Sequence, residues 1–141
     1  MGVGVDAAGR PVGYLRVCKD RIDGATLYRS QAAEHERERG MWSAAKPVTS
    51  FARWSLAEPG PSWTAKSPLG RLTTGEYTLY GWTNDNSSSA GDVVFTRAKL
   101  ERLRPGEVLY WAGDVSKDGN RYPNVVVSET EFRREACKMV E

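Results

Sequence analysis

Short runs of alternating apolar and polar residues dominate this chain, and they constrain its fold more than any other feature. Successive side chains of a β-strand point to opposite faces, so alternation predicts strands with one buried face. The clearest run extends from Glu76 to Thr83, with Tyr77 and Leu79 on one face and Tyr80 and Trp82 on the other. Further strands are predicted at residues 3–5, 12–18, 25–28, 49–56, 92–96, 107–112 and 124–128. In the strand at 12–18, Leu15 and Val17 fall on one face, and Val12, Tyr14 and Cys18 on the other.

Only two segments have features typical of a helix. Residues 97–103 predict a short helical turn, which Pro105 and Gly106 would end. Ser128 and Glu131 have the spacing of a capping box, in which each residue satisfies a backbone N–H of the other. The C-terminal helix that follows has Phe132 and Ala136 on one face, where they can dock on a sheet.

Many short strands with close turn signals and little helix predict a mainly-β protein, an antiparallel β-sandwich. No long Gly/Ser tract divides the chain, so residues 1–141 are expected to form one domain. Two segments are predicted as long loops. Residues 30–47 are charged on every side, and residues 57–68 are rich in proline and glycine.

The composition excludes some classes of partner. The chain has 20 basic and 18 acidic residues, a net charge of +2, which gives no electrostatic footprint for nucleic acid. No run of about 18 apolar residues predicts a membrane span. The first residues lack the pattern of a secretory signal. Two locations are expected, the cytoplasm for the chain as written, or outside the cell if a leader has been removed.

Leu72, Gly75 and Tyr77 carry a local resemblance. Their spacing is similar to the tyrosine corner of fibronectin type III and other immunoglobulin-like sandwiches, in which a tyrosine at the start of a strand returns its hydroxyl to nearby backbone. The resemblance implies an immunoglobulin-like sandwich and no activity, because such folds have many unrelated functions. The opening Val5–Val12 resembles that of small actinobacterial proteins, which adds no function.

Cys18 and Cys137 are the only two cysteines and lie near opposite ends of the chain. A bridge between them would close a very long loop, for which loop entropy gives a stabilisation of about 4–5 kcal/mol. In a reducing compartment both would instead be small buried thiols. With His35 as the single imidazole, they do not form a usual zinc site.

No catalytic motif stands out. We expect no catalytic residue, no bound metal and no cofactor. A nucleotide-binding glycine loop and a nucleophile elbow are both missing from the sequence. His35 lies in a charged stretch that is poorly suited to hold a catalytic base. A small enzyme that uses Cys18 or a pair of carboxylates is the remaining catalytic hypothesis, with candidates Glu76, Asp85, Asp92, Glu107 and Asp114. The oxygen-rich segment 84–92 has too few carboxylates for a calcium loop.

Aromatic residues are the strongest indication of function, since the chain has five tryptophans and six tyrosines. Trp42 and Trp63 fall in predicted loops, while Tyr80 and Trp82 share a strand face. Exposed tryptophan and tyrosine side chains often anchor interfaces or stack on sugar rings. One interpretation is that these side chains only cover the ends of the core. As a binding surface, the four residues predict a non-catalytic protein-interaction domain, with a carbohydrate-binding sandwich as the alternative. The partner is expected to be another protein or a glycan, and the oligomeric state stays open.

Overall fold

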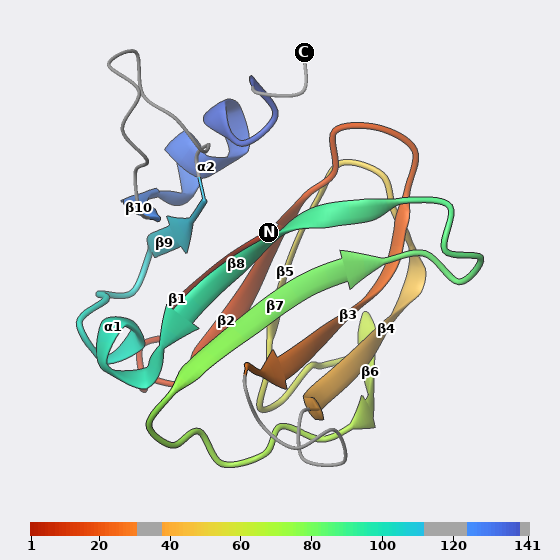
Figure 1. Cartoon of the computed structure of the whole chain (residues 1–141). Coiled ribbons are helices and arrows are strands. Elements are labelled where there is room, and N and C mark those ends of the chain that lie inside the picture. The colour runs from red at the N-terminus through yellow and green to blue at the C-terminus, as the bar shows by residue number, and fades with distance from the viewer. Residues whose placement is uncertain (31–37, 112–123, 139–141) are drawn as a thin grey trace.

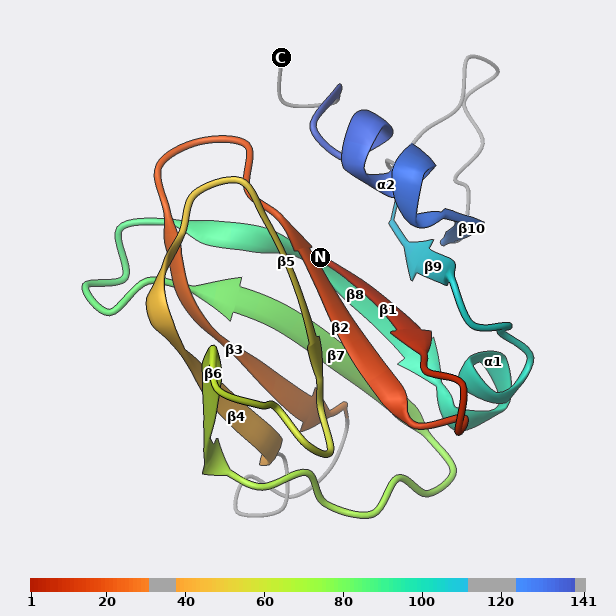
Figure 2. The ribbon, with the colours of Figure 1, turned by 180° about the vertical axis from the view of Figure 1, so that it is seen from behind.

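Two antiparallel sheets packed face to face form the molecule, as the computed structural model shows (Figures 1 and 2). The structure describes residues 1–30, 38–111 and 124–138. The main core fills the space between the sheets and takes large apolar side chains from both, such as Leu15, Leu27 and Leu79. The prediction of a mainly-β sandwich with a short C-terminal helix is confirmed.

Sheet A has the strand order β10–β9–β1–β2–β5. Its strands are β1 (Gly2–Val5), β2 (Pro11–Arg16), β5 (Phe51–Ser55), β9 (Glu107–Tyr110) and β10 (Val125–Ser128). In β2 the alternation places Leu15 in the main core, while Val12 and Tyr14 contact a second apolar cluster on the other side of the sheet. The predicted faces of this strand are therefore correct.

Sheet B has the strand order β6–β4–β3–β7–β8. Its strands are β3 (Ile22–Arg29), β4 (Glu38–Val48), β6 (Trp63–Ser67), β7 (Glu76–Trp82) and β8 (Ser89–Thr96). Tyr77 and Leu79 of β7 are fully buried, and Tyr80 and Trp82 lie on the outer face, as the alternation predicts.

Both predicted long loops contain a strand, which corrects the sequence interpretation. The segment predicted as a loop at 30–47 contains most of β4, and the one at 57–68 contains β6. In β4 the charged end of the strand conceals a short alternation that places Gly40 and Trp42 inward. Gly40 fits there because the indole of Trp42 lies against its Cα, where a side chain would collide with the ring.

Two short helices complete the described part of the chain. Helix α1 (Arg97–Glu101) is capped by the Thr96 hydroxyl, which accepts from the backbone N–H of Lys99 at 3.2 Å. Helix α2 (Glu129–Glu135) begins at the predicted cap, where the Ser128 hydroxyl accepts from the N–H of Glu131 at 3.1 Å. The Glu131 carboxylate accepts from the same hydroxyl at 3.2 Å in place of the Ser128 backbone N–H, so half of the predicted capping box forms. No helix in the described segments has the length and apolar character that crossing a membrane requires.

Helix α2 covers the outer face of sheet A. Phe132 is fully buried in the second apolar cluster, where its ring meets those of Tyr14 and Tyr110 at centroid distances of 6.2 and 5.2 Å. Both contacts are edge-on, the arrangement that aromatic quadrupoles favour. Sheet A is thus buried on both faces along β2, β1 and β9.

The turn before β7 has the hydrogen bonds that its sequence suggests. The Tyr77 hydroxyl accepts from the N–H of Thr73 at 2.7 Å and lies 3.3 Å from the carbonyl oxygen of the same residue. Gly75 adopts a positive φ of 119°, which glycine reaches without strain. The corner fixes the start of β7, and with it the register of the strand that presents Tyr80 and Trp82.

The two sheets do not extend equally far on the side of the sandwich where β8 and β10 lie. β8 is the last strand of sheet B and packs against β1 and β9, whereas β10 lies one strand further out in sheet A (Figure 1). Sheet A therefore overhangs sheet B on this side, and the free side of β8 lies beneath the overhang.

Candidate functional site

Two of the four aromatic residues predicted to bind a partner are in the core instead. Trp42 is fully buried and Trp63 nearly so, both in strands of sheet B. They meet Trp54 of sheet A, which stacks on Trp63 at 4.1 Å between ring centroids and contacts Trp42 edge-on. The indole N–H of Trp42 donates to the carbonyl of Leu56 at 3.2 Å. The prediction that Trp42 and Trp63 are exposed is wrong, because three indoles fill one end of the sandwich.

The other two predicted residues lie together on the surface. Tyr80 and Trp82 are half-buried on the outer face of β7, and Tyr28 of β3 joins them, its ring 5.7 Å from that of Tyr80. We call Tyr28, Tyr80 and Trp82 the aromatic face. Sequence analysis did not single out Tyr28, because its place in a predicted strand was the one available signal and its register next to β7 is known only from the structure.

Hydroxyl groups lie among the rings of the aromatic face. Thr26 pairs with Tyr80 and Thr78 pairs with Tyr28, so threonines and tyrosines alternate across the two strands. The indole N–H of Trp82 donates to the Thr26 hydroxyl at 2.9 Å and so is held across β3. No charged residue lies on this stretch of the two strands between Tyr28 and Trp82.

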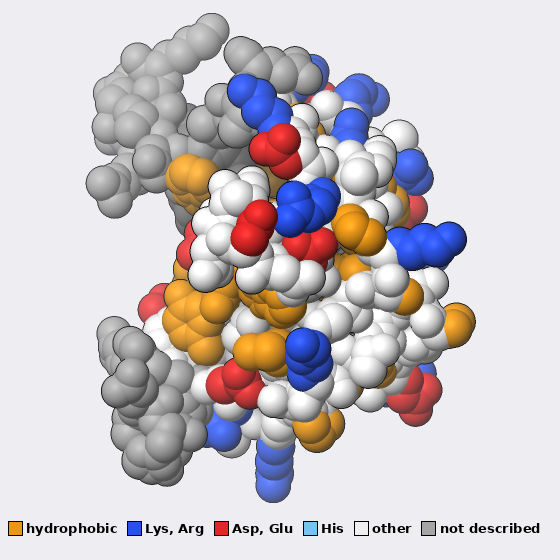
Figure 3. Space-filling model, turned by 90° about the vertical axis from the view of Figure 1, so that its right-hand side faces the viewer, with side chains coloured by type: hydrophobic (Ala, Val, Ile, Leu, Met, Phe, Trp, Pro, Cys, Tyr) orange, Lys and Arg blue, Asp and Glu red, His pale blue; other side chains and the backbone are white. Residues whose placement is uncertain are grey.

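The two tyrosine rings of the aromatic face are not coplanar. Tyr28 and Tyr80 meet at an interplanar angle of 68°. The stacked pair of tryptophans, Trp54 and Trp63, is in the core. A flat platform for a sugar ring needs parallel rings, whereas an irregular apolar surface suits side chains of a protein. Figure 3 shows one side of the molecule, where hydrophobic side chains gather with basic and acidic ones at their border.

The polar turn that follows the aromatic face is held by hydrogen bonds between its own groups. The carboxylate of Asp23 is buried and accepts from the N–H of Asn84 at 2.9 Å. Hydrogen bonds from Ser87 hold the pKa of Asp85 well below its usual range, and Arg21 lies 3.3 Å from the same carboxylate. Nowhere in the described residues do three His, Cys, Asp or Glu side chains gather as metal ligands.

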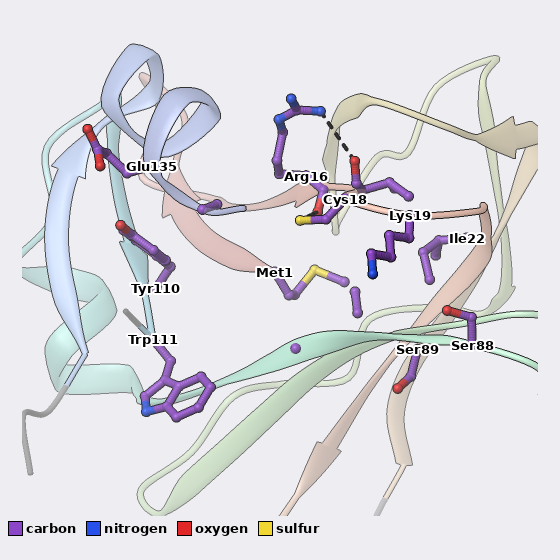
Figure 4. Close-up of a pocket in the computed structure, with 14 residues that line it drawn as sticks. Met1, Arg16, Cys18, Lys19, Ile22, Ser88, Ser89, Tyr110, Trp111 and Glu135 are labelled. Carbon is purple, nitrogen blue, oxygen red and sulfur yellow. Dashed lines mark hydrogen bonds between the residues drawn. The ribbon is translucent and has the colours of Figure 1, made fainter. Parts of the chain in front are cut away.

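A cavity of about 300 Å³ lies at the open end of the sandwich, between the start of β1 and the start of β8. Met1, Val17, Ile22 and Ala90 give it an apolar floor. Figure 4 shows Trp111 at one end of the cavity; this residue is 40% exposed. Sequence analysis did not choose Trp111, because nothing around it distinguishes an exposed tryptophan from a buried one.

Met1, which lines this cavity, has a buried α-amino group. In a chain that begins at Met1, burial lowers the pKa of the amino group from 8.0 to about 6, and the negative charge of Asp92 opposes the change. The amine is thus largely neutral at physiological pH. The cavity can take a small apolar group, but its polar groups do not converge as those of a catalytic site would.

Cys18 and Cys137 form a disulfide, with their Cα atoms 5.4 Å apart. The bridge joins the end of α2 to the segment after β2 and forms part of the cavity wall. In this state Cys18 has no thiolate, so the catalytic hypothesis loses its nucleophile. Of the proposed carboxylates, Glu107 accepts from the N–H of Arg104 at 2.7 Å within a turn. His35 and Asp114 lie outside the described residues.

Comparison with known proteins does not assign the chain to a family. No family model matches it, and neither does any curated protein or solved structure at the threshold used. Its function is therefore inferred from its own residues.

Proposed function

We propose that the chain is a non-catalytic binding domain, and that a partner protein contacts the aromatic face of sheet B. The observation that carries the proposal is the grouping of Tyr28, Tyr80 and Trp82, half-buried and uncharged, on one exposed sheet face. Tyrosine and tryptophan are the residues most enriched at the energetic centres of protein interfaces.

The rigidity of the aromatic face supports the proposal. Its residues lie on β3 and β7, two central strands of a sheet whose opposite face is fully packed. The hydrogen bond from Trp82 to Thr26 fixes the indole before any partner arrives. A side chain that is ordered in the free protein loses little conformational entropy on binding, which favours affinity.

A glycan remains the second candidate, because the Thr26 and Thr78 hydroxyls lie among aromatic rings. The angle of 68° between Tyr28 and Tyr80 favours the protein partner. The disulfide between Cys18 and Cys137 supports work in an oxidising compartment, where such bonds persist.

The test compares four forms of the full chain as bait for proteins from the source organism. These are the unchanged chain, the variants Tyr80→Thr and Trp82→Thr, and Trp111→Thr as a control exposed aromatic outside the aromatic face. We expect a partner that the unchanged chain and the Trp111 variant retain equally. Its affinity should fall about thirtyfold or more in the Tyr80 and Trp82 variants, the loss that a hot spot of about 2 kcal/mol gives.

Circular dichroism of each variant checks that the fold is kept. A panel of soluble glycans is titrated in parallel, followed by tryptophan fluorescence. Glycan binding that the Tyr80 and Trp82 variants lose would favour the carbohydrate-binding alternative. Partners that bind all variants equally would remove the aromatic face from the function.

A further inference from the structure

β8 is a long strand with one side free. It has eight residues, and among the described strands it pairs with β7 alone, since it ends sheet B. The other terminal strands have familiar protection, because β5 carries Arg53, β6 carries Lys66 and β10 has only four residues. β8 carries one charge, Asp92, in its first half, whereas residues 93–96 are uncharged. In the middle of β8 the exposed residue is Val94, which is 37% exposed.

At Val94 a side chain, and not a further strand, bonds the main chain on the free side of β8. Val94 lies opposite Thr78 of β7, yet its carbonyl accepts a hydrogen bond from the side-chain amide of Asn124, on the other side of the strand. In an antiparallel strand the N–H and C=O of one residue point the same way, so the N–H of Val94 also faces the free side. The amide of Asn124 thus stands where the N–H of a further strand would lie.

The overhang of sheet A provides a second wall. Leu109 of β9 faces the interior, and its partner Val126 of β10 is on the same face but 47% exposed, because sheet B ends before it. Together with Leu103 they line a groove of about 470 Å³ that also contains Asn124. The groove therefore adjoins the free side of β8.

Two basic residues stand at the end of the groove. Lys99 and Arg102, from the end of α1, are exposed and line it. The acidic residue in the groove, Glu107, already accepts the N–H of Arg104 within its own turn. The charge that the groove offers to a ligand is therefore positive.

We propose that the free side of β8 and the overhang of β9 and β10 form a second binding site, separate from the aromatic face. Its ligand is an extended segment of a partner polypeptide, which adds to β8 as a sixth strand of sheet B. Alternate side chains of the segment pack on Leu109 and Val126, and an acidic residue at one end meets Lys99 and Arg102. Main-chain pairing supplies affinity, and the groove selects the sequence.

A single strand fits this site, whereas a second copy of the domain does not. Antiparallel pairing of two β8 strands would place both sheets A on the same side, with strands about 4.8 Å apart. Each overhang projects at least one strand past its own β8, so the two β10 strands would occupy the same space. The ligand is therefore an extended strand that has no second sheet projecting past it.

The probe is a fluorescein-labelled octapeptide with three Thr-Val repeats and two aspartates. It is made in two forms, with the aspartates first or last, because the direction of pairing is not fixed. The control peptide has the same side chains but is N-methylated along the repeats, which removes its amide donors. Fluorescence anisotropy with the full oxidised chain should show saturable binding of one form, and binding at least tenfold weaker for the N-methylated peptide.

Two variants locate the site. Val94→Pro removes an N–H that the sheet does not use, and the double variant Lys99→Glu, Arg102→Glu reverses the charge of the groove; each should weaken binding at least tenfold. Lys66→Glu reverses one charge on β6, at the other end of sheet B, which is half the charge change of the double variant, and should leave binding unchanged. Circular dichroism checks each variant, and the charge variants keep the test decisive if Val94→Pro does not fold.

Three results would overturn the proposal. They are no binding of either octapeptide, equal binding of the N-methylated form, or equal loss in Lys66→Glu and the double variant. A dimer of the unchanged chain in sedimentation that Val94→Pro dissociates would assign the free side of β8 to a second copy instead.

Discussion

At the scale of single residues, Gly24 shows how closely the aromatic face depends on the strand beneath it. A Cβ at this position would collide with the indole of Trp82 and lie 2.6 Å from the carbonyl oxygen of Trp42. The ring of Trp82 can move, but the backbone of β4 is held in the sheet. Gly24 therefore allows Trp82 to lie across β3 and to reach Thr26.

Gly24→Ala is expected to destabilise the fold by about 1–3 kcal/mol, the usual cost of overpacking. It should also displace the indole and weaken any ligand of the aromatic face. Gly91→Ala is the matched control, since Gly91 has open space around it and should change stability by less than about 0.5 kcal/mol. Urea unfolding of both variants measures the difference, and equal stabilities would refute the packing argument.

The buried amine of Met1 predicts a dependence of stability on pH. In a chain that begins at Met1, its pKa is about 6 in the folded state against an ordinary value of 8.0, so between these values the unfolded chain binds more protons. The stabilisation is fully present above pH 8 and is lost as pH falls towards 6. The lowered pKa corresponds to a loss of about 2–3 kcal/mol. Urea unfolding at pH 8.5, 7 and 5.5 measures it.

Two variants separate this effect from other titrations. His35→Gln removes the single histidine, and the dependence on pH should survive it. Asp92→Asn removes the charge that raises the pKa of the amine, so stability should fall further on acidification. A free energy of unfolding that is constant from pH 8.5 to 5.5 would contradict the assignment.

At the scale of elements, the disulfide and Phe132 together hold α2 on sheet A. The bridge closes a loop with a sequence separation of 119, and loop entropy gives it about 4–5 kcal/mol. Replacement of Cys18 and Cys137 by alanine should lower the free energy of unfolding by a similar amount, less any strain. Sheet B and its aromatic face should keep their structure, because Phe132 still packs α2 in a separate cluster.

Calorimetry of the double alanine variant against the oxidised chain measures this loss. Reduction of the unchanged chain should give the same result, which controls for the substitutions themselves. Equal stability of the oxidised and reduced forms would show that the bridge does not constrain the unfolded chain.

Alternation predicted the strands in which each face has a clear character. β2 and β7 were correct to the face, and the capping box correctly marked the start of α2, because these signals are local. β4 and β6 were missed because their signals are short and lie beside charged residues or prolines. The burial of Trp42 and Trp63 was beyond local reasoning, since it depends on contact with Trp54 of the other sheet.

The difference between local signals and contacts of distant strands also explains which residues of the candidate sites could be predicted. Tyr80 and Trp82 were found because one strand carries both. Tyr28 joins them only through the pairing of β3 with β7, which sequence periodicity does not specify. The groove beside β8 could not be predicted at all, because it arises from the different extents of two sheets. The pairing of strands that are distant in sequence decides which side chains meet, and this pairing cannot be predicted from the periodicity of a single sequence.

At the scale of the whole molecule, the place of β1 has a consequence for synthesis. In sheet A, β1 is synthesised before the other strands, yet it lies between β2 and β9, which ends at Tyr110. A nascent chain can form the hairpin of β1 and β2 early, but one side of β1 then stays unpaired until β9 has been made, and β9 ends 94 residues after β2. Folding of this layer therefore has to wait for the synthesis of β9, and until then the unfinished hairpin needs protection from wrong partners.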